Sequence, residues 1–266
     1  MDSYTLTQIN IYPVKSLGGI LLQSSRVDER GLKYDRRWMI VNENNQFITQ
    51  RKYPQMSLLQ PEIKENLLII NHKQNKVTPL TISLSPYSEE EINVQIWKDN
   101  IPAIKYNSDV NEWFTKAIGL RCSLVYMPDT TKRKVNPRYV DNQIVSFADG
   151  YPFLIIGEES FVELNNRLKD PLPMNRFRPN LVFSGGEPFD EDGWKRFRIG
   201  GLEFRSIKPC SRCVVTTVDQ NTSNKGKEPL KTLSQYREVN GKVMFGMNLV
   251  CEVTGKLKMG DQINHL

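Results

Sequence analysis

The chain has 266 residues, of which 39% are apolar and 25% are charged, and its formal net charge of +6 gives a pI near 9.0. This composition excludes a disordered chain and leaves enough apolar residues for a sizeable core, in one large or two modest domains. A phosphorylated cofactor, an acidic protein and a nucleic acid would each suit the positive charge. No stretch approaches the roughly 18 apolar residues of a membrane span, and the amino terminus lacks a basic segment followed by an apolar run, so a cytoplasmic location is expected.

Short strands separated by polar turns fill the first third of the sequence. Residues 4–12 read as a strand that ends at residues 13–19, where a proline and paired glycines predict a loop carrying Lys15 and Ser16. Further strand patterns follow at residues 38–41, 47–49, 67–70, 80–84 and 92–96. The first two of these flank a polar turn, which is typical of a hairpin.

Helical spacing is clear in two segments. Apolar residues recur from residue 110 to 118 behind Asp109, with Glu112 in a capping-box position and Gly119 as a stop signal. A second stripe covers residues 161–168. Between these helices lies a basic, weakly patterned segment, which predicts a boundary between a first domain, residues 1–125, and a second domain, residues 126–266.

Strand patterns dominate again after the boundary, at residues 151–156, 181–184, 197–199, 202–206, 213–218 and 249–253. Their short spacing and the scarcity of helices between them favour a closed or sandwich-like antiparallel sheet over a doubly wound parallel sheet. The predicted fold class is therefore mainly β with peripheral helices (α+β).

The most informative segment, residues 208–213, reads Lys-Pro-Cys-Ser-Arg-Cys. Two thiols lie beside two cations, and neighbouring positive charge favours the reactive thiolate. Three explanations suit the pair of Cys210 and Cys213: structural zinc, thioredoxin-like exchange, or one thiolate ligand for a thiophilic metal held mainly by an organic cofactor. A structural zinc site needs four Cys or His ligands, and a chain with one cysteine pair and two histidines offers few. Thioredoxin-like exchange would require a helix directly after the cysteine pair, where this sequence has β-branched residues. Cys122 and Cys251 read as inert, reduced packing residues.

Several basic motifs fit a phosphorylated cofactor. Lys15 and Ser16 on the glycine-rich loop can offer an ammonium, a hydroxyl and backbone NH groups to one phosphate. Arg36 lies at the mouth of a strand, and Arg178 offers a planar guanidinium suited to bidentate phosphate contact. Asp149 precedes an apolar strand and could accept hydrogen bonds from a ring bearing NH groups. The alternative for each cation is a solvated surface charge, and for Asp149 a turn cap.

The order of these motifs resembles that of MOSC-domain proteins, most closely the amidoxime-reducing components and their bacterial relatives. The matching segments, which together cover nearly the whole chain, are residues 11–16, 31–38, 177–180, 208–219, 227–230 and 245–248. The resemblance implies an amino-terminal β-barrel-like companion domain followed by a β-barrel-like MOSC domain.

The resemblance also implies a molybdenum cofactor, a pterin whose dithiolene holds the metal, with Cys213 as the protein's thiolate ligand. Cys210 would have a supporting or packing role. The remaining positions would contact the cofactor's phosphate and pterin or line the same pocket: Lys15, Ser16, Arg36, Asp149, Gly150, Arg178, Asn180, Ser211 and Arg212.

The activity implied is reduction of N-hydroxylated compounds, such as amidoximes, hydroxylamines and N-hydroxylated bases, by cleavage of the N–O bond. The sequence shows neither a membrane anchor nor a ferredoxin domain, so a separate flavin, haem or iron–sulfur protein is expected to supply electrons, and no membrane is expected as a partner. The alternative is a sulfur or molybdenum-cofactor carrier with a persulfide on Cys213 or Cys210, as in the MOSC domains of cofactor sulfurases. Pyridoxal phosphate binding is expected at the family level only. Nucleic-acid binding through residues 132–138 and Tyr139 ranks last, and no nucleic-acid partner is expected.

Overall fold

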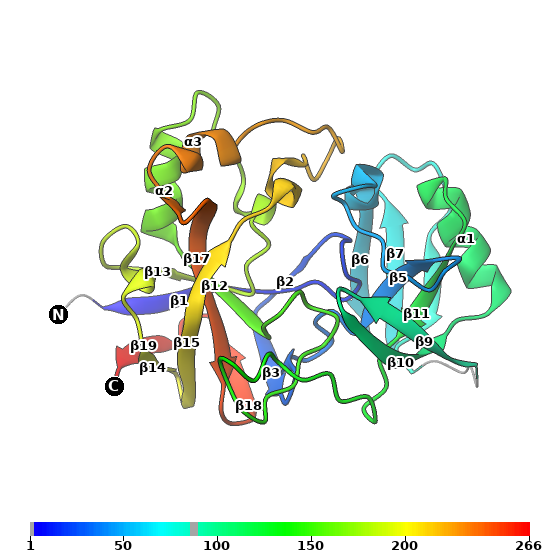
Figure 1. The fold of residues 1–266 in the computed structure, drawn as a ribbon, viewed down its shortest axis with the longest axis horizontal. Coiled ribbons are helices and arrows are strands. Elements are labelled where there is room, and N and C mark those ends of the chain that lie inside the picture. The colour runs from blue at the N-terminus through cyan, green and yellow to red at the C-terminus, as the bar shows by residue number, and fades with distance from the viewer. Residues whose placement is uncertain (1–2, 86–89) are drawn as a thin grey trace.

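The computed structural model describes residues 3–85 and 90–266. Strands make up 41% of the protein and helices 15%, which confirms the predicted mainly β fold class. Figure 1 shows two lobes side by side, one built around a closed barrel and the other around smaller sheets. We call them the barrel lobe and the small-sheet lobe.

The barrel lobe is closed because its first and last strands pair with each other. The strand order around it is β12 (Phe153–Gly157), β13 (Leu181–Ser184), β1 (Tyr4–Ile11), β19 (Gln262–His265), β14 (Arg196–Ile199), β15 (Leu202–Ser211) and β17 (Lys242–Cys251). Its edges carry β2 (Ile20–Leu22) and β16 (Glu238–Val239), and β3 (Ser24–Asp28), β4 (Gly31–Leu32) and β18 (Gly255–Lys258) form a further sheet.

The two faces of β12 show how the barrel lobe is packed. Phe153 and Ile155 face the barrel core, whereas Leu154 and Ile156 face a second apolar cluster that includes Phe177. Successive side chains of a strand point to opposite faces, and both faces of β12 are covered, so every residue of the strand is buried. Helix α2 (Glu158–Asn166) connects β12 to β13, and these two strands pair in parallel. Among the described residues, the sheet that was predicted to be antiparallel therefore contains one parallel strand pair.

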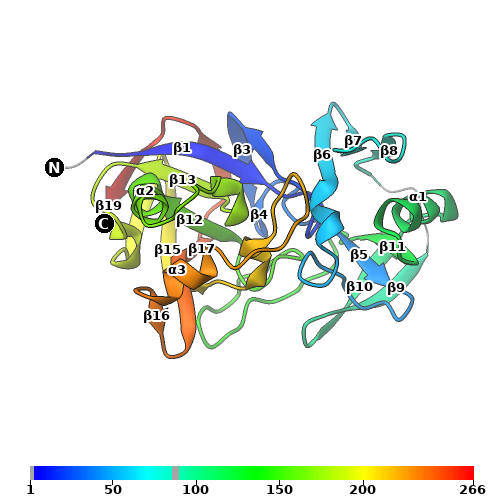
Figure 2. The same cartoon turned by 90° about the horizontal axis from the view of Figure 1, so that it is seen from above.

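The small-sheet lobe holds two sheets and the longest helix (Figure 2). The strands are β5 (Trp38–Asn42), β11 (Cys122–Tyr126), β10 (Asp99–Lys105) and β9 (Glu91–Ile96) in one sheet, and β6 (Leu59–Lys64), β7 (Leu67–His72) and β8 (Leu80–Ser83) in the other. The cap of helix α1 (Ser108–Ile118) lies two residues before the predicted Asp109, because the Asn107 side chain accepts a hydrogen bond from the Val110 NH. Gly119 ends the helix in the left-handed region, which confirms the predicted stop.

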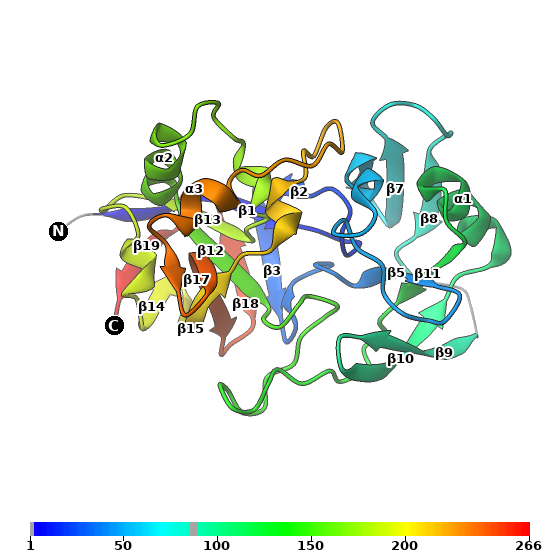
Figure 3. The same ribbon diagram turned by 45° about the horizontal axis from the view of Figure 1, so that its top comes forward.

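The remaining helical segments are short: α3 (Leu230–Ser234) and the 3-10 turns η1 (Pro54–Leu58), η2 (Met174–Arg176), η3 (Asp190–Asp192) and η4 (Val214–Thr217). Within the described residues, no helix is both long and apolar enough to cross a membrane. Helices α2 and α3 lie on the barrel lobe and α1 on the far side of the small-sheet lobe (Figure 3).

The chain passes between the lobes soon after it starts. Strand β1 lies inside the barrel sheet between β13 and β19, so residues 4–11 pack with the carboxy-terminal half of the chain. The chain then enters the small-sheet lobe at β5. The loop after β1 and the turn before β5 therefore lie at the junction of the lobes. The predicted division at residues 125 and 126 stays a prediction.

Candidate functional site: a cationic pocket at the lobe junction

All of the residues predicted to touch a cofactor line one pocket, which encloses about 160 Å³. They come from both lobes and from segments far apart in the sequence: Lys15, Ser16, Arg36, Asp149, Gly150, Arg178, Asn180, Ser211, Arg212 and Cys213. Cys210 lines it too. The structure thus brings the set together, and the role of each residue in binding stays a prediction.

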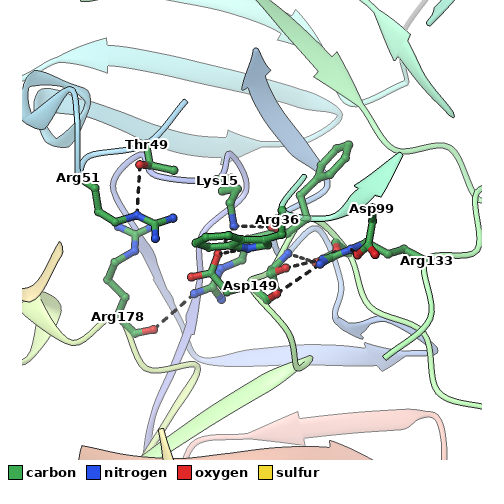
Figure 4. Close-up of polar contacts among 12 residues, drawn as sticks. Lys15, Arg36, Thr49, Arg51, Asp99, Arg133, Asp149 and Arg178 are labelled. Atoms are coloured by element: carbon green, nitrogen blue, oxygen red, sulfur yellow. Dashed lines mark hydrogen bonds and ion pairs between the residues drawn. The ribbon is translucent and has the colours of Figure 1, made fainter. Parts of the chain in front are cut away.

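Lys15 and Asp149 form the centre of the polar network in Figure 4. The buried Lys15 ammonium donates to the Phe147 carbonyl at 2.8 Å and to the Asp149 carboxylate at 2.5 Å. Burial lowers the pKa of Lys15 to about 8, although Asp149 opposes that shift. Burial alone would raise the pKa of Asp149, but the ammonium of Lys15 holds it well below its usual range. The Asp149 side chain itself remains exposed at the pocket mouth.

Tyr12 holds two guanidinium groups close together. The central carbon of Arg36 lies 4.4 Å from the centre of the Tyr12 ring, and that of Arg178 lies 4.1 Å from it. Asp35 forms an ion pair with Arg36 at 2.7 Å. Burial lowers the pKa of Arg178 to about 10, so the Arg178 guanidinium stays charged at neutral pH. Two half-buried cations on one ring repel each other, so the arrangement suits an anionic ligand that contacts both.

The backbone at three of these positions is unusual. Ser16, Arg36 and Arg178 have φ values of 68°, 49° and 56°, in the left-handed region that disfavours residues with a Cβ. Such conformations persist only where the surrounding structure imposes them, and they cluster at functional sites. Strain at three separate pocket positions supports a ligand-binding role for the pocket.

Cys213 lies where the chain leaves β15 and turns away. Two bulges, at 206–208 and 209–211, bend the end of this strand toward the pocket. The predicted strand over residues 213–218 was wrong, because Val214–Thr217 form the 3-10 turn η4. The hydroxyls of Thr216 and Thr217 donate to the carbonyls of Cys213 and Val214 at 3.0 and 2.8 Å, a local pattern that competes with strand pairing. This turn leaves the Cys213 side chain exposed in the pocket.

Of the two cations near the thiols, Arg212 contacts a sulfur atom and Lys208 does not. Arg212 contacts the sulfur of Cys210 at 3.1 Å and donates to the Phe177 carbonyl, and the ammonium of Lys208 lies over two tyrosine rings. Arg212 therefore ties the half-buried Cys210 to the pocket wall and leaves Cys213 as the accessible thiol.

The other two cysteines lie outside the pocket. Burial raises the pKa of Cys122 and of Cys251 to about 11, which favours the protonated, less reactive thiol, and their role as packing residues stays a prediction. Cys122 is buried, whereas Cys251 is half-buried and its thiol donates to the Val253 carbonyl.

Sequence reasoning missed several residues around the pocket. Arg51 and Thr49 line it from the small-sheet lobe, and the Trp97 indole NH donates to Asp149 at 3.2 Å. Arg133 lies in the basic segment that predicted the domain boundary, and it is buried and pairs with Asp99 at 2.8 Å (Figure 4). The sequence carries one signal for Trp97, because a tryptophan is unusual in a two-residue hairpin turn. No local sequence feature predicts that Arg133 is buried near the pocket.

The donor set fits the cofactor that the motifs imply. One carboxylate, Asp149, lies among the residues that line the pocket. Five cations also line it: Lys15, Arg36, Arg51, Arg178 and Arg212. No group of three or more His, Cys, Asp or Glu side chains that could hold a metal occurs in residues 3–85 and 90–266. A metal bound at Cys213 would therefore take its other ligands from an organic group, and the cations would hold that group's phosphate.

Comparison with known proteins decides the family. The family pattern described as the MOSC N-terminal beta barrel domain matches residues 3–121, and the MOSC domain pattern matches residues 142–264. The chain belongs to the MOSC family. The rat mitochondrial amidoxime reducing component 2 is 33% identical to it over 97% of this chain and 82% of the rat protein.

A second group of MOSC relatives carries a different name. The molybdenum cofactor sulfurase of Arabidopsis thaliana is 33% identical over 98% of this chain, and that of rice is 35% identical over 92%. The chain spans only about a third of the length of these sulfurases, 35% and 32% respectively. The name of these sulfurases refers to the molybdenum cofactor.

Proposed function

We propose that the protein binds the molybdenum cofactor in this pocket and reduces N-hydroxylated compounds, including amidoximes, hydroxylamines and N-hydroxylated bases. The observation that carries the proposal is the convergence of the exposed Cys213 thiol with Lys15, Arg36 and Arg178 in one pocket. The amidoxime-reducing relatives, which match across most of both chains, support it. A separate flavin, haem or iron–sulfur protein would supply the electrons, and a cytoplasmic location remains our expectation.

Each pocket residue has a role that follows from its surroundings. Lys15, Arg36 and Arg178 would hold the phosphate by charge-assisted hydrogen bonds, with Ser16 beside them. Cys213 would be the metal ligand, and Ser211 and Arg212 would shape the wall next to it. When bound, the cofactor supplies the two-electron chemistry that N–O cleavage requires.

Asn180 and Asp149 would orient the pterin. Asn180 is buried, and its side-chain carbonyl accepts from Arg36 at 3.1 Å and from the Leu154 NH at 3.3 Å, which fixes the amide. Asp149 stays ionised at neutral pH because of Lys15, so it accepts hydrogen bonds and does not donate a proton. Gly150 lies beside it, and a Cβ there would meet nothing within 4 Å, so a ligand has room at this edge of the pocket.

A carrier function is the second candidate. The sulfurase relatives favour it, and an exposed thiol at Cys213 could hold a persulfide. A carrier would bind the cofactor without reducing a small substrate. The family-level expectation of pyridoxal phosphate binding is not carried over to this chain.

Replacement of the thiol tests the proposal. In protein from a host that makes the pterin cofactor, Cys213→Ser should abolish reduction of benzamidoxime with an artificial reductant and should lower bound molybdenum in elemental analysis. Cys251→Ser, outside the pocket, is the matched control and should keep both. Full activity in Cys213→Ser would overturn the site assignment, and a molybdenum-loaded wild type that never reduces benzamidoxime would favour the carrier.

A further inference from the structure

A long groove opens from the side of the cofactor pocket. It encloses about 1070 Å³ and shares Asp149, Gly150 and Tyr151 with the pocket, so the two are continuous. We call it the aromatic groove; its rings are Phe47, Trp97, Tyr139 and Tyr151. Phe47 and Trp97 come from the small-sheet lobe, and the two tyrosines from the segment that leads into the barrel lobe.

Trp97 is the most informative residue of the aromatic groove. It occupies the two-residue connection between β9 and β10, where Ile96 pairs with Asp99, and its φ of 55° is left-handed. Such turns favour Asn or Gly, and a bulky residue there is costly. The ring is 41% exposed, yet it is held in place by the Asp149 carboxylate at 3.2 Å and by the Arg51 guanidinium at 4.3 Å. The two-residue turn itself requires this backbone conformation, so it is the choice of an exposed tryptophan there that points to a ligand.

Another part of the groove lining is an aromatic pair with a cation on it. The ammonium of Lys208 lies 4.5 Å from the ring centre of Tyr139 and 5.4 Å from that of Tyr151. The two rings meet edge to face at 6.2 Å, and Tyr139 is 39% exposed. The groove therefore offers a flat ring aromatic surface from the two tyrosines as well as from Phe47 and Trp97.

The charges of the aromatic groove are unbalanced. Its carboxylates are already paired, Asp99 with Arg133 at 2.8 Å and Asp149 with Lys15 at 2.5 Å. Lys98, Lys134 and Lys208 are exposed and have no ion-pair partner in the described part of the chain. The groove thus offers aromatic surface together with unpaired positive charge.

We propose that the aromatic groove binds the body of the substrate, a planar aromatic ring that carries an anionic group, and directs its N-hydroxylated end into the pocket of Cys213. This inference rests on the proposed function, because the bound compound is taken to be the substrate of the reductase. Binding to the aromatic groove can nevertheless be measured without the reaction. The ring contacts Trp97 and the tyrosines, and the anionic group contacts Lys208 and its neighbours.

The test compares benzamidoxime, 4-carboxybenzamidoxime and 4-phosphonobenzamidoxime. Calorimetric titration of each into protein without reductant measures binding, and turnover with reductant gives KM. Wild-type protein should bind the charged compounds more tightly than the neutral one. Lys208→Gln should reduce that preference by about two- to fivefold, the range for one exposed ion pair. Trp97→Leu should weaken binding of all three compounds, and Trp97→Phe should restore most of it.

Lys116→Gln, on the exposed face of α1, is the matched charge control and should leave the preference intact. An unchanged preference in Lys208→Gln, or equal binding by Trp97→Leu and wild type, would overturn the inference. Binding with the expected preferences but without turnover would support the aromatic groove and count against the reductase function. Turnover of benzamidoxime with no preference for either charged compound would leave the reductase function standing and remove this inference.

Discussion

At the scale of single residues, the charge of Lys15 should control ligand binding near neutral pH. Its pKa of about 8 means that the protonated form, which binds an anion, is lost as pH rises above that value. Affinity for inorganic pyrophosphate, a probe of the phosphate site, should therefore fall above about pH 8, and calorimetry at several pH values measures this. Lys15→Arg should remove the fall because a guanidinium stays charged. A pH profile identical in the two proteins would contradict this role.

Tyr12 should position Arg36 and Arg178 rather than contact the ligand itself. Burial raises the pKa of Tyr12 to about 12, so its ring stays neutral and presents a face to each guanidinium. Tyr12→Leu removes both cation–π contacts and should weaken pyrophosphate binding about tenfold. Tyr12→Phe keeps the ring and loses only the hydroxyl's bond to the Pro179 carbonyl, so it should bind nearly as wild type does. Equal losses in both variants would show that the ring has no positioning role.

At the scale of elements, a glycine sets how β17 crosses β12. Gly246 has a φ of 77°, and a Cβ there would lie 2.8 Å from the Ile155 carbonyl oxygen of β12. Gly246→Ala should lower the free energy of unfolding by about 2–4 kcal/mol, from the left-handed backbone and the steric clash together. Gly241→Ala has a similar φ of 71° but meets nothing within 4 Å, so it should cost only about 1 kcal/mol. Urea unfolding measures both, and similar losses would exclude the clash as the cause.

The end of β15 shows the limit of local patterns at this scale. The β-branched residues 214–218 favour the predicted strand over residues 213–218, but the threonine hydroxyls donate to nearby carbonyls and hold a 3-10 turn. Strand propensity reflects packing on a pleated surface more than backbone preference, so it fails where the chain leaves the sheet. This departure exposes Cys213, the residue on which the proposed chemistry depends.

At the scale of the whole molecule, the pocket joins segments that the sequence separates. Lys15 and Arg36 follow β1 and precede β5, and Arg178 comes from the barrel lobe. An anion bound to all three should stabilise the folded state by mass action, about 1.4 kcal/mol at ten times its dissociation constant. Pyrophosphate should therefore raise the midpoint of thermal unfolding by a few degrees in a protein of this size.

The matched variants for this experiment are Arg178→Gln, in the pocket, and Arg26→Gln, an exposed arginine in β3. The first should lose the stabilisation and the second should keep it. Equal stabilisation of both variants would point to nonspecific ion binding.

Local sequence patterns were enough to predict the mainly β fold, the loop that carries Lys15 and Ser16, the stop of α1 at Gly119 and, through the order of the motifs, the family. These features follow from local chemistry, because glycine, proline and periodic apolar residues constrain the backbone where they stand. The gathering of Trp97, Arg51 and Arg133 around one site is visible only in the folded molecule. Their positions depend on pairings between distant strands and on how two lobes meet, and no residue near them in the sequence records those contacts.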